Sequence, residues 1–109
     1  QLVRKVPIPD NVVEYAVKLV HKTRPHTQGA SQLANDFLEW GAGPRASQFL
    51  VTGAKCNALL NGKYSPDIED VIAVAKPALR HRIVRNFKAE AESVTVDGII
   101  EKLIAEMAN

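Results

Sequence analysis

The chain has 109 residues, 46% of them hydrophobic and 24% charged, which is the composition of one ordinary globular domain. Its formal charge of +2 is too small to require a nucleic-acid partner. No apolar run approaches the roughly 18 residues that a membrane-spanning helix needs, so we expect no membrane insertion. The single cysteine, Cys56, excludes an internal disulfide and is typical of a reducing compartment, so we expect a cytoplasmic protein.

Two helices are predicted in the first part of the chain. One begins with Asp10 as its N-cap and ends near Thr23, before Pro25. The other begins at Gly43 and Pro44, because proline is favoured in the first turn of a helix, and it ends at the Asn-Gly pair of residues 61–62. The apolar spacing predicts that the two helices bury Val13, Ala16, Val17, Val20, Ala46, Phe49, Leu50, Gly53 and Leu60.

Two further helices follow. The third has Ser65 as its N-cap and Pro66 in its first turn, and we expect Pro77 to break or kink it before a short continuation over residues 78–83. After a connector over residues 86–93, Thr95 caps the fourth helix. The predicted buried residues are Ile68, Val71, Ile72, Ala75, Val96, Ile99, Ile100, Leu103, Ile104 and Met107. Since no segment alternates strongly like a strand, the predicted fold class is all-α, a small four-helix bundle.

A long connector separates the first two helices. Residues 24–43 show no clean period, and a structureless connection of this length is uncommon inside a compact domain. We therefore expect Leu33, Phe37, Leu38 and Trp40 to hold a short helical or extended element against the bundle. Residues 24–29 are expected to form an exposed loop.

Arg45 is the candidate functional residue. It is predicted to lie in the first turn of the second helix, where the helix dipole and unpaired N–H groups disfavour a cation by about 0.3 to 1 kcal/mol. It also begins an outward polar stripe that continues through Gln48, Thr52 and Lys55. A guanidinium beside free N–H groups suits a phosphate. An arginine that is only solvated, or paired with a carboxylate, explains the pattern equally well.

Several motifs resemble one protein family. Residues 40–47 read Trp-Gly-Ala-Gly-Pro-Arg-Ala-Ser and are similar to the Gly-Ala-Ser-Pro-Arg-Ala motif that opens the sensor-2 helix in the C-terminal lid of MoxR-type AAA+ ATPases. Residues 65–71 and 74–83 resemble the following block of that family, and residues 10–25 resemble its first lid helix. The resemblance extends from Pro9 to Leu103. One departure is Gly43, where the family commonly has serine, although glycine is an acceptable N-cap.

The resemblance implies a role for each matching residue. Arg45 would be the sensor-2 arginine, with Gly43 and Pro44 beside it, and would approach the phosphates of ATP held by an AAA+ nucleotide-binding domain of the same or a neighbouring subunit. The Mg²⁺ ion and the P-loop would belong to that domain, because this chain has no G-x-x-x-x-G-K-[ST] motif. The fragment alone should therefore bind no cofactor and hydrolyse no ATP.

The resemblance also implies what the longer protein is. Residues 1–109 would be a single helical lid domain, and because the chain begins at Gln1 and not at Met, we expect a fragment of a longer ATPase. That ATPase would form a ring-shaped homo-oligomer and couple ATP hydrolysis to ring motion in the chaperone-like assembly or maturation of client proteins.

Other candidate sites are weaker. Arg80, His81 and Arg82, with Arg85 and Lys88, could form a phosphate or nucleic-acid patch, but a solvated or salt-bridged helix end is the favoured interpretation. The three histidines and Cys56 lack metal-ligand spacing, so no metal site is expected. We expect Cys56 to be a small buried hydrophobic residue. Ser47 and Ser65 have no readable His and Asp partners, and no catalytic residue is assigned. Trp40 and Phe37 could stack on an adenine ring, but we expect them instead to hold the connector against the bundle.

Two alternative functions stay open. The chain could be a helical protein-interaction module without a nucleotide role, in which Arg45 is incidental. It could also be a small basic nucleic-acid binder that uses residues 80–88, against which the near-neutral charge argues.

Overall fold

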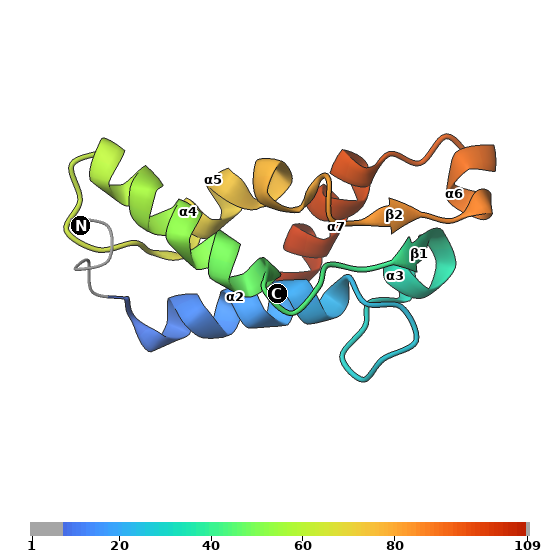
Figure 1. Cartoon of the computed structure of the whole chain (residues 1–109), viewed down its shortest axis with the longest axis horizontal. Coiled ribbons are helices and arrows are strands. Elements are labelled where there is room, and N and C mark those ends of the chain that lie inside the picture. The colour runs from blue at the N-terminus through green and yellow to red at the C-terminus, as the bar shows by residue number, and fades with distance from the viewer. Residues whose placement is uncertain (1–7, 109) are drawn as a thin grey trace.

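A computed structural model describes residues 8–108 of the chain (Figure 1). In chain order the elements are α2 (Asp10–Lys22), α3 (Gln32–Phe37), β1 (Leu38–Trp40), α4 (Ala46–Leu60), α5 (Ile68–Leu79), β2 (Val84–Arg85), α6 (Phe87–Ala91) and α7 (Val96–Met107). None of these helices is long and apolar enough to cross a membrane.

The four longest helices form one hydrophobic core. Helix α5 packs most extensively on α4, and α2 and α7 pack against that pair (Figure 1). Each helix contributes fully buried apolar side chains because its hydrophobic residues recur with helical spacing. The largest of these are Val12, Leu19 and Val20 from α2, Leu50 from α4, Val71 and Leu79 from α5, and Ile99, Ile100 and Leu103 from α7. The predicted bundle is thus confirmed for the core of the molecule.

The count of four helices is wrong, because residues 8–108 form six helices and a two-stranded sheet, of which α3, α6 and the sheet lie outside the four-helix core. Strands β1 and β2 pair antiparallel, with Leu38 opposite Arg85 and Trp40 opposite Val84. They have three and two residues, too few for alternation to be visible in the sequence. Helix α6 occupies the segment predicted as a connector, and the side chain of Asn86 caps it by accepting a hydrogen bond from the Ala89 N–H.

The long connector folds largely as expected. It contains α3 and β1, and Leu38 is buried while Leu33 and Phe37 pack partly buried against the core. The expectation for Trp40 is wrong, because 67% of this residue is exposed. The strand pairing is irregular between Leu38 and Trp40, so the alternation that would bury both residues is broken.

Some predicted core residues lie at the surface. Val13, Phe49, Leu60 and Ile72 are all exposed, Phe49 by 47% and Leu60 by 87%. The buried face of α4 consists instead of Ala46, Leu50, Ala54 and Ala58. These residues are mostly small and let α5 approach closely, and a Cβ on Gly53 would lie only 3.1 Å from the side chain of Val74. Cys56 is half-buried, not fully buried as expected.

The helix starts differ in detail from the predictions. Thr95 caps α7 as expected. The N-cap of α5 is Asp67, not Ser65, and that of α2 is Pro9, with Asp10 as the first helical residue. Pro77 lies inside α5 without ending it, and the helix continues to the buried Leu79. Only the hydrogen bond of the missing Pro77 N–H is lost, and it is lost close to the end of the helix.

Candidate functional site

The candidate site is the turn that leads into α4. The Ala46 N–H donates to the Gly43 carbonyl at 3.1 Å, so Pro44 and Arg45 form a turn and the helix begins later than predicted. Arg45 is the N-cap residue and does not lie inside the first turn. Its side chain makes no capping hydrogen bond and is exposed. The outward orientation predicted for Arg45 is therefore confirmed, although its place relative to the helix is corrected.

A buried threonine fixes the chain just before this turn. The Thr23 hydroxyl donates to the Val20 carbonyl at 2.6 Å and accepts from the Ala42 N–H at 3.0 Å. The Arg24 Nε donates to the Ala42 carbonyl at 2.9 Å. Gly41 is required here because a Cβ at this position would lie 2.3 Å from the Thr23 carbonyl oxygen. The end of α2 thus holds the backbone that positions Arg45.

Arg45 shares a shallow surface hollow with a second arginine. The hollow has a volume of about 480 Å³ and is lined by Gly43, Pro44, Arg45, Ala46, Phe49 and Arg82. Arg82 comes from the turn between α5 and β2, and its guanidinium carbon lies 4.1 Å from the centre of the Phe49 ring. Its Nη1 donates to the Ala78 carbonyl at 2.7 Å. The structure therefore brings the predicted residues Gly43, Pro44 and Arg45 together with a cation from a distant part of the sequence.

Neither arginine of the hollow is neutralised within the described part of the chain. No ion pair joins Arg45 or Arg82 to a carboxylate of residues 8–108. No acidic residue of the described part of the chain lines the hollow. The lining of the hollow therefore carries a net positive charge, which suits an anion.

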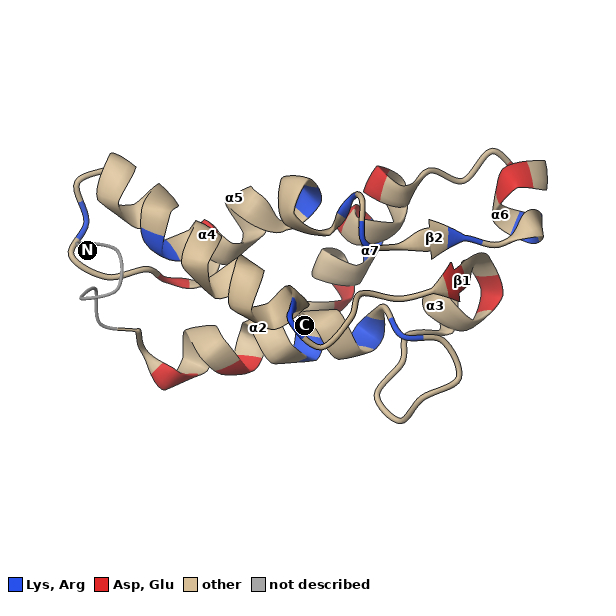
Figure 2. Cartoon of the chain, in the orientation of Figure 1, with Lys and Arg blue, Asp and Glu red and all other residues tan. Residues whose placement is uncertain are grey.

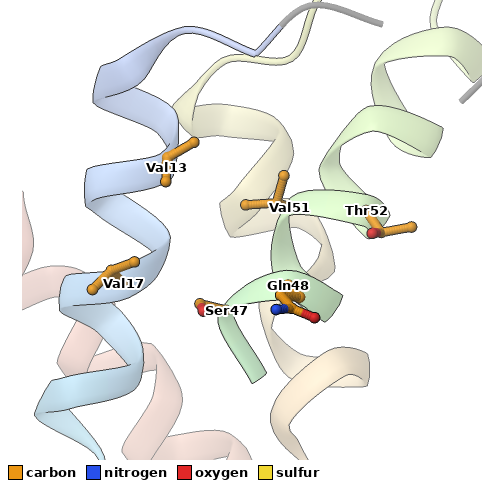
Figure 3. Close-up of a pocket in the computed structure, with 6 residues that line it drawn as sticks. All are labelled: Val13, Val17, Ser47, Gln48, Val51 and Thr52. Atoms are coloured by element: carbon orange, nitrogen blue, oxygen red, sulfur yellow. The ribbon is translucent and has the colours of Figure 1, made fainter. Parts of the chain in front are cut away.

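The predicted polar stripe lies on the outer side of α4. Gln48 and Thr52 are exposed with Arg45, and Lys55 is half-buried. Beside this stripe, a groove between α2 and α4 is lined by Val13, Val17, Ser47, Gln48, Val51 and Thr52 (Figure 3). Within residues 8–108 no charged, histidine or cysteine side chain lines this groove, so none of them is an acid–base partner for Ser47 there.

The basic segment from Arg80 to Lys88 does not form one patch. Arg80 makes a bidentate ion pair with Asp97, with distances of 2.8 and 3.0 Å. The Arg85 Nη1 donates to the Val94 carbonyl at 2.8 Å, and the Lys88 Nζ lies 5.3 Å from the centre of the Phe37 ring. Arg82 alone turns toward the hollow. The interpretation as a solvated or salt-bridged helix end thus fits Arg80, which is paired with Asp97, and Arg82, which is exposed.

Charge at the rest of the surface is mixed. Figure 2 shows basic and acidic residues interspersed along the molecule. The hydrogen bond from Arg80 lowers the pKa of the Asp97 carboxyl, and the same pair raises the pKa of Arg80. Among residues 8–108 no cluster of three or more His, Cys, Asp or Glu side chains could hold a metal ion.

The sequence reasoning missed three parts of the site: Thr23, Gly41 and the contact of Arg82 with Phe49. Gly41 and Arg82 lie within motifs that the sequence did single out, but nothing in their spacing shows which residue each one meets. Phe49 was assigned to the core because helical spacing identifies an apolar face without showing what covers it.

Comparisons with known proteins identify the family of the chain. The sequence profile of the family described as "AAA lid domain" matches residues 30–103. Chaperone MoxR1 of Mycobacterium tuberculosis is 31% identical over 89% of this chain and 26% of its own length. The YeaC protein of Bacillus subtilis is 27% identical over 94% of this chain and 29% of its own.

A solved structure has the same fold. The crystal structure of a candidate ATPase from Cytophaga hutchinsonii superimposes with a TM-score of 0.87 at 32% identity, over 95% of this chain and 32% of that protein. The chain thus spans about a quarter to a third of the proteins it matches. The family profile, the relatives and the superposition lead to one conclusion: the chain belongs to the AAA lid domain family and is related to MoxR-type chaperones.

Proposed function

We propose that this lid covers the nucleotide site of a MoxR-type AAA+ ATPase and presents Arg45 to the phosphates of ATP as the sensor-2 arginine. The observation that carries the proposal is an exposed arginine on a fixed turn. Arg45 follows a backbone segment held by Thr23 and has no carboxylate partner among the described residues. A planar guanidinium in this position can bind two phosphate oxygens at once.

The residues present fit the phosphate part of a nucleotide. Among the described residues the hollow is lined by two arginines and no acidic side chain, so it suits polyphosphate oxygens and not Mg²⁺. The metal ion, the P-loop and the attacking water would belong to the nucleotide-binding domain of the same or a neighbouring subunit. When bound, ATP supplies the negative charge that Arg45 stabilises. The lid alone would hydrolyse no ATP.

The lid would couple the nucleotide state to motion. A charge-assisted hydrogen bond between Arg45 and the γ-phosphate exists only while that phosphate is present. Because the turn before α4 is held by α2, a change at Arg45 would move the helical core as one body. In a ring-shaped homo-oligomer in the cytoplasm, this motion would drive chaperone-like assembly or maturation of client proteins.

The test replaces Arg45 in the full-length protein. Arg45→Ala should reduce ATP affinity, and with it turnover, about ten- to hundredfold, since a charge-assisted contact is worth about 1.5 to 3 kcal/mol. Arg45→Lys should recover only part of the loss, because an ammonium lacks the planar fork. Lys55→Ala, which removes a cation from the far end of the same stripe, is the matched control and should stay within twofold. If Arg45→Ala also stays within twofold, the sensor-2 role is wrong.

One observation favours a second function. Three exposed apolar side chains, Trp40, Val84 and Phe87, belong to the small sheet and the residues directly after it, and Trp40 and Val84 pair across the strands. Exposed aromatic residues are enriched at protein interfaces. The domain would then be a protein-interaction module without a nucleotide role. Replacing Trp40 and Phe87 with serine would change partner binding and leave ATP affinity unaltered.

A further inference from the structure

The feature of the hollow that is still unexplained is the pairing of Arg82 compared with that of its neighbours. Arg80, Arg82 and Arg85 lie within one short segment, yet they have different partners. Arg80 is paired with Asp97, and Arg85 lies 4.0 Å from Glu90. Arg82 has no carboxylate partner among residues 8–108. The fold therefore neutralises the two neighbouring cations and leaves the middle one unpaired beside Arg45.

The side chain of Arg82 is nevertheless held in place. Its guanidinium lies over the Phe49 ring, with 4.1 Å between the central carbon and the ring centre, and its Nη1 donates to the Ala78 carbonyl at 2.7 Å. Stacking on an aromatic ring together with a hydrogen bond restricts a flexible side chain. Because one N–H group is used by Ala78, the other N–H groups of the guanidinium remain able to bind a ligand.

Phe49 is an apolar residue that is half-exposed in the hollow, and packing in the core does not explain this exposure. It lies one helical turn after Arg45, so both side chains reach the same hollow, and 47% of it is exposed. An exposed phenylalanine contributes less to the core than a buried one. It provides instead the flat surface on which Arg82 lies.

We propose that Arg82, supported by Phe49, is a second ligand for the nucleotide polyphosphate and binds it together with Arg45. This inference rests on the nucleotide role proposed above and adds a binding residue to it. The two arginines come from the start of α4 and from the turn after α5, and these two helices pack extensively against each other. Phosphate oxygens between them would relieve the repulsion of the two cations and connect both segments to the nucleotide.

The experiment measures ATP affinity of full-length variants with a fluorescent ATP analogue. Arg82→Ala should weaken binding about tenfold or more, and Arg82→Lys should restore only part of it. Arg80→Ala is the matched control, because it removes the same charge from an exposed ion pair two positions away, and it should stay within twofold. Phe49→Leu keeps an apolar side chain but removes the stacked ring, so it should weaken binding by a smaller factor than Arg82→Ala.

Two further variants keep the proposal falsifiable. Arg82→Gln retains a side-chain donor for the Ala78 carbonyl, so it decides the question if Arg82→Ala lowers the melting temperature. In the Arg45→Ala, Arg82→Ala double variant, the loss should differ severalfold from the product of the two single losses, because both residues bind one polyphosphate. If Arg45→Ala weakens ATP binding while Arg82→Ala and Arg82→Gln stay within twofold, the role of Arg82 is overturned and that of Arg45 stands. If Arg45→Ala has no effect, the proposed function itself fails.

Discussion

The charged side chains near the two ends of α4 differ in burial and in hydrogen bonding. Near its C-terminal end, the carboxylate of Asp70 is buried and accepts hydrogen bonds from the Asn57 amide at 2.8 Å, the Lys63 ammonium at 2.9 Å and the Asp67 N–H at 2.8 Å. At its N-terminal end, Arg45 and Arg82 share an exposed hollow that no acidic side chain of residues 8–108 lines. Removing a buried charge leaves its hydrogen-bond partners unpaired and destabilises the fold, whereas a charge left unpaired at the surface is available to a partner.

The largest effect on stability is expected near the C-terminal end of α4, at the buried Asp70. Asp70 is 1% exposed, so Asp70→Ala leaves the Asn57 amide, the Asp67 N–H and the Lys63 ammonium without their acceptor. We expect a loss of about 3 kcal/mol in the free energy of unfolding, measured by urea denaturation. Glu69→Ala, which removes an exposed acid from the same helical turn, should cost no more than about 0.5 kcal/mol. Equal losses in the two variants would show that the network around Asp70 contributes nothing.

The same network makes stability depend on pH. Burial alone would raise the pKa of Asp70, but the hydrogen bonds from Asp67, Lys63 and Asn57 outweigh burial, and the pKa is lowered. A lowered pKa means that the stabilisation is present above the unfolded pKa of about 3.9 and is lost as the pH falls through the folded value. The melting temperature should therefore fall between about pH 5 and pH 2. Asp70→Asn should show a smaller fall, and an unchanged fall would contradict the assignment to Asp70.

The next largest effect is expected at the turn that leads into α4. Thr23→Val removes the hydroxyl that accepts from the Ala42 N–H, and this buried donor then lacks a partner. We expect a loss of about 1 to 2 kcal/mol in stability and a further loss in ATP turnover, because the turn that carries Arg45 is no longer fixed. Thr27→Val is the control, since its exposed hydroxyl donates only to the Arg24 carbonyl. Reduced stability with normal turnover would mean that Thr23 does not position the site.

The smallest effect on stability is expected at the N-terminal end of α4, at Phe49. Phe49 is half-exposed, so Phe49→Ala should cost only about 1 kcal/mol, against about 3 kcal/mol for the fully buried neighbour in Leu50→Ala. Thermal melts of the two variants compare these values directly. A Phe49→Ala loss as large as that of Leu50→Ala would place Phe49 in the core after all.

Much of the fold follows from the sequence because local rules and packing agree. The Thr95 cap and the buried Ile99, Ile100 and Leu103 of α7 were all predicted from caps and apolar spacing. The strands β1 and β2 could not be predicted in this way, since each is short and is held by pairing with a segment distant in the chain.

The site was predicted less completely than the fold. Arg45 could be singled out because a cation at the start of a helix violates a local preference, which frequently indicates function. The sequence does not distinguish Arg82 as a candidate site residue, because it is one of several neighbouring cations. Only the turn after α5 and the exposed ring of Phe49 distinguish it, and both depend on tertiary packing.

ATP and Mg²⁺ should raise the melting temperature of the full-length protein, and this rise can be measured directly in each variant. A ligand that binds only the folded state stabilises it according to its affinity. We expect a clear rise in the parent, an equal rise in Asp70→Asn from a lower starting temperature, and a much smaller rise in Arg45→Ala from an unchanged starting temperature. An undiminished rise in Arg45→Ala would contradict the proposal that this lid contributes an arginine to the nucleotide site.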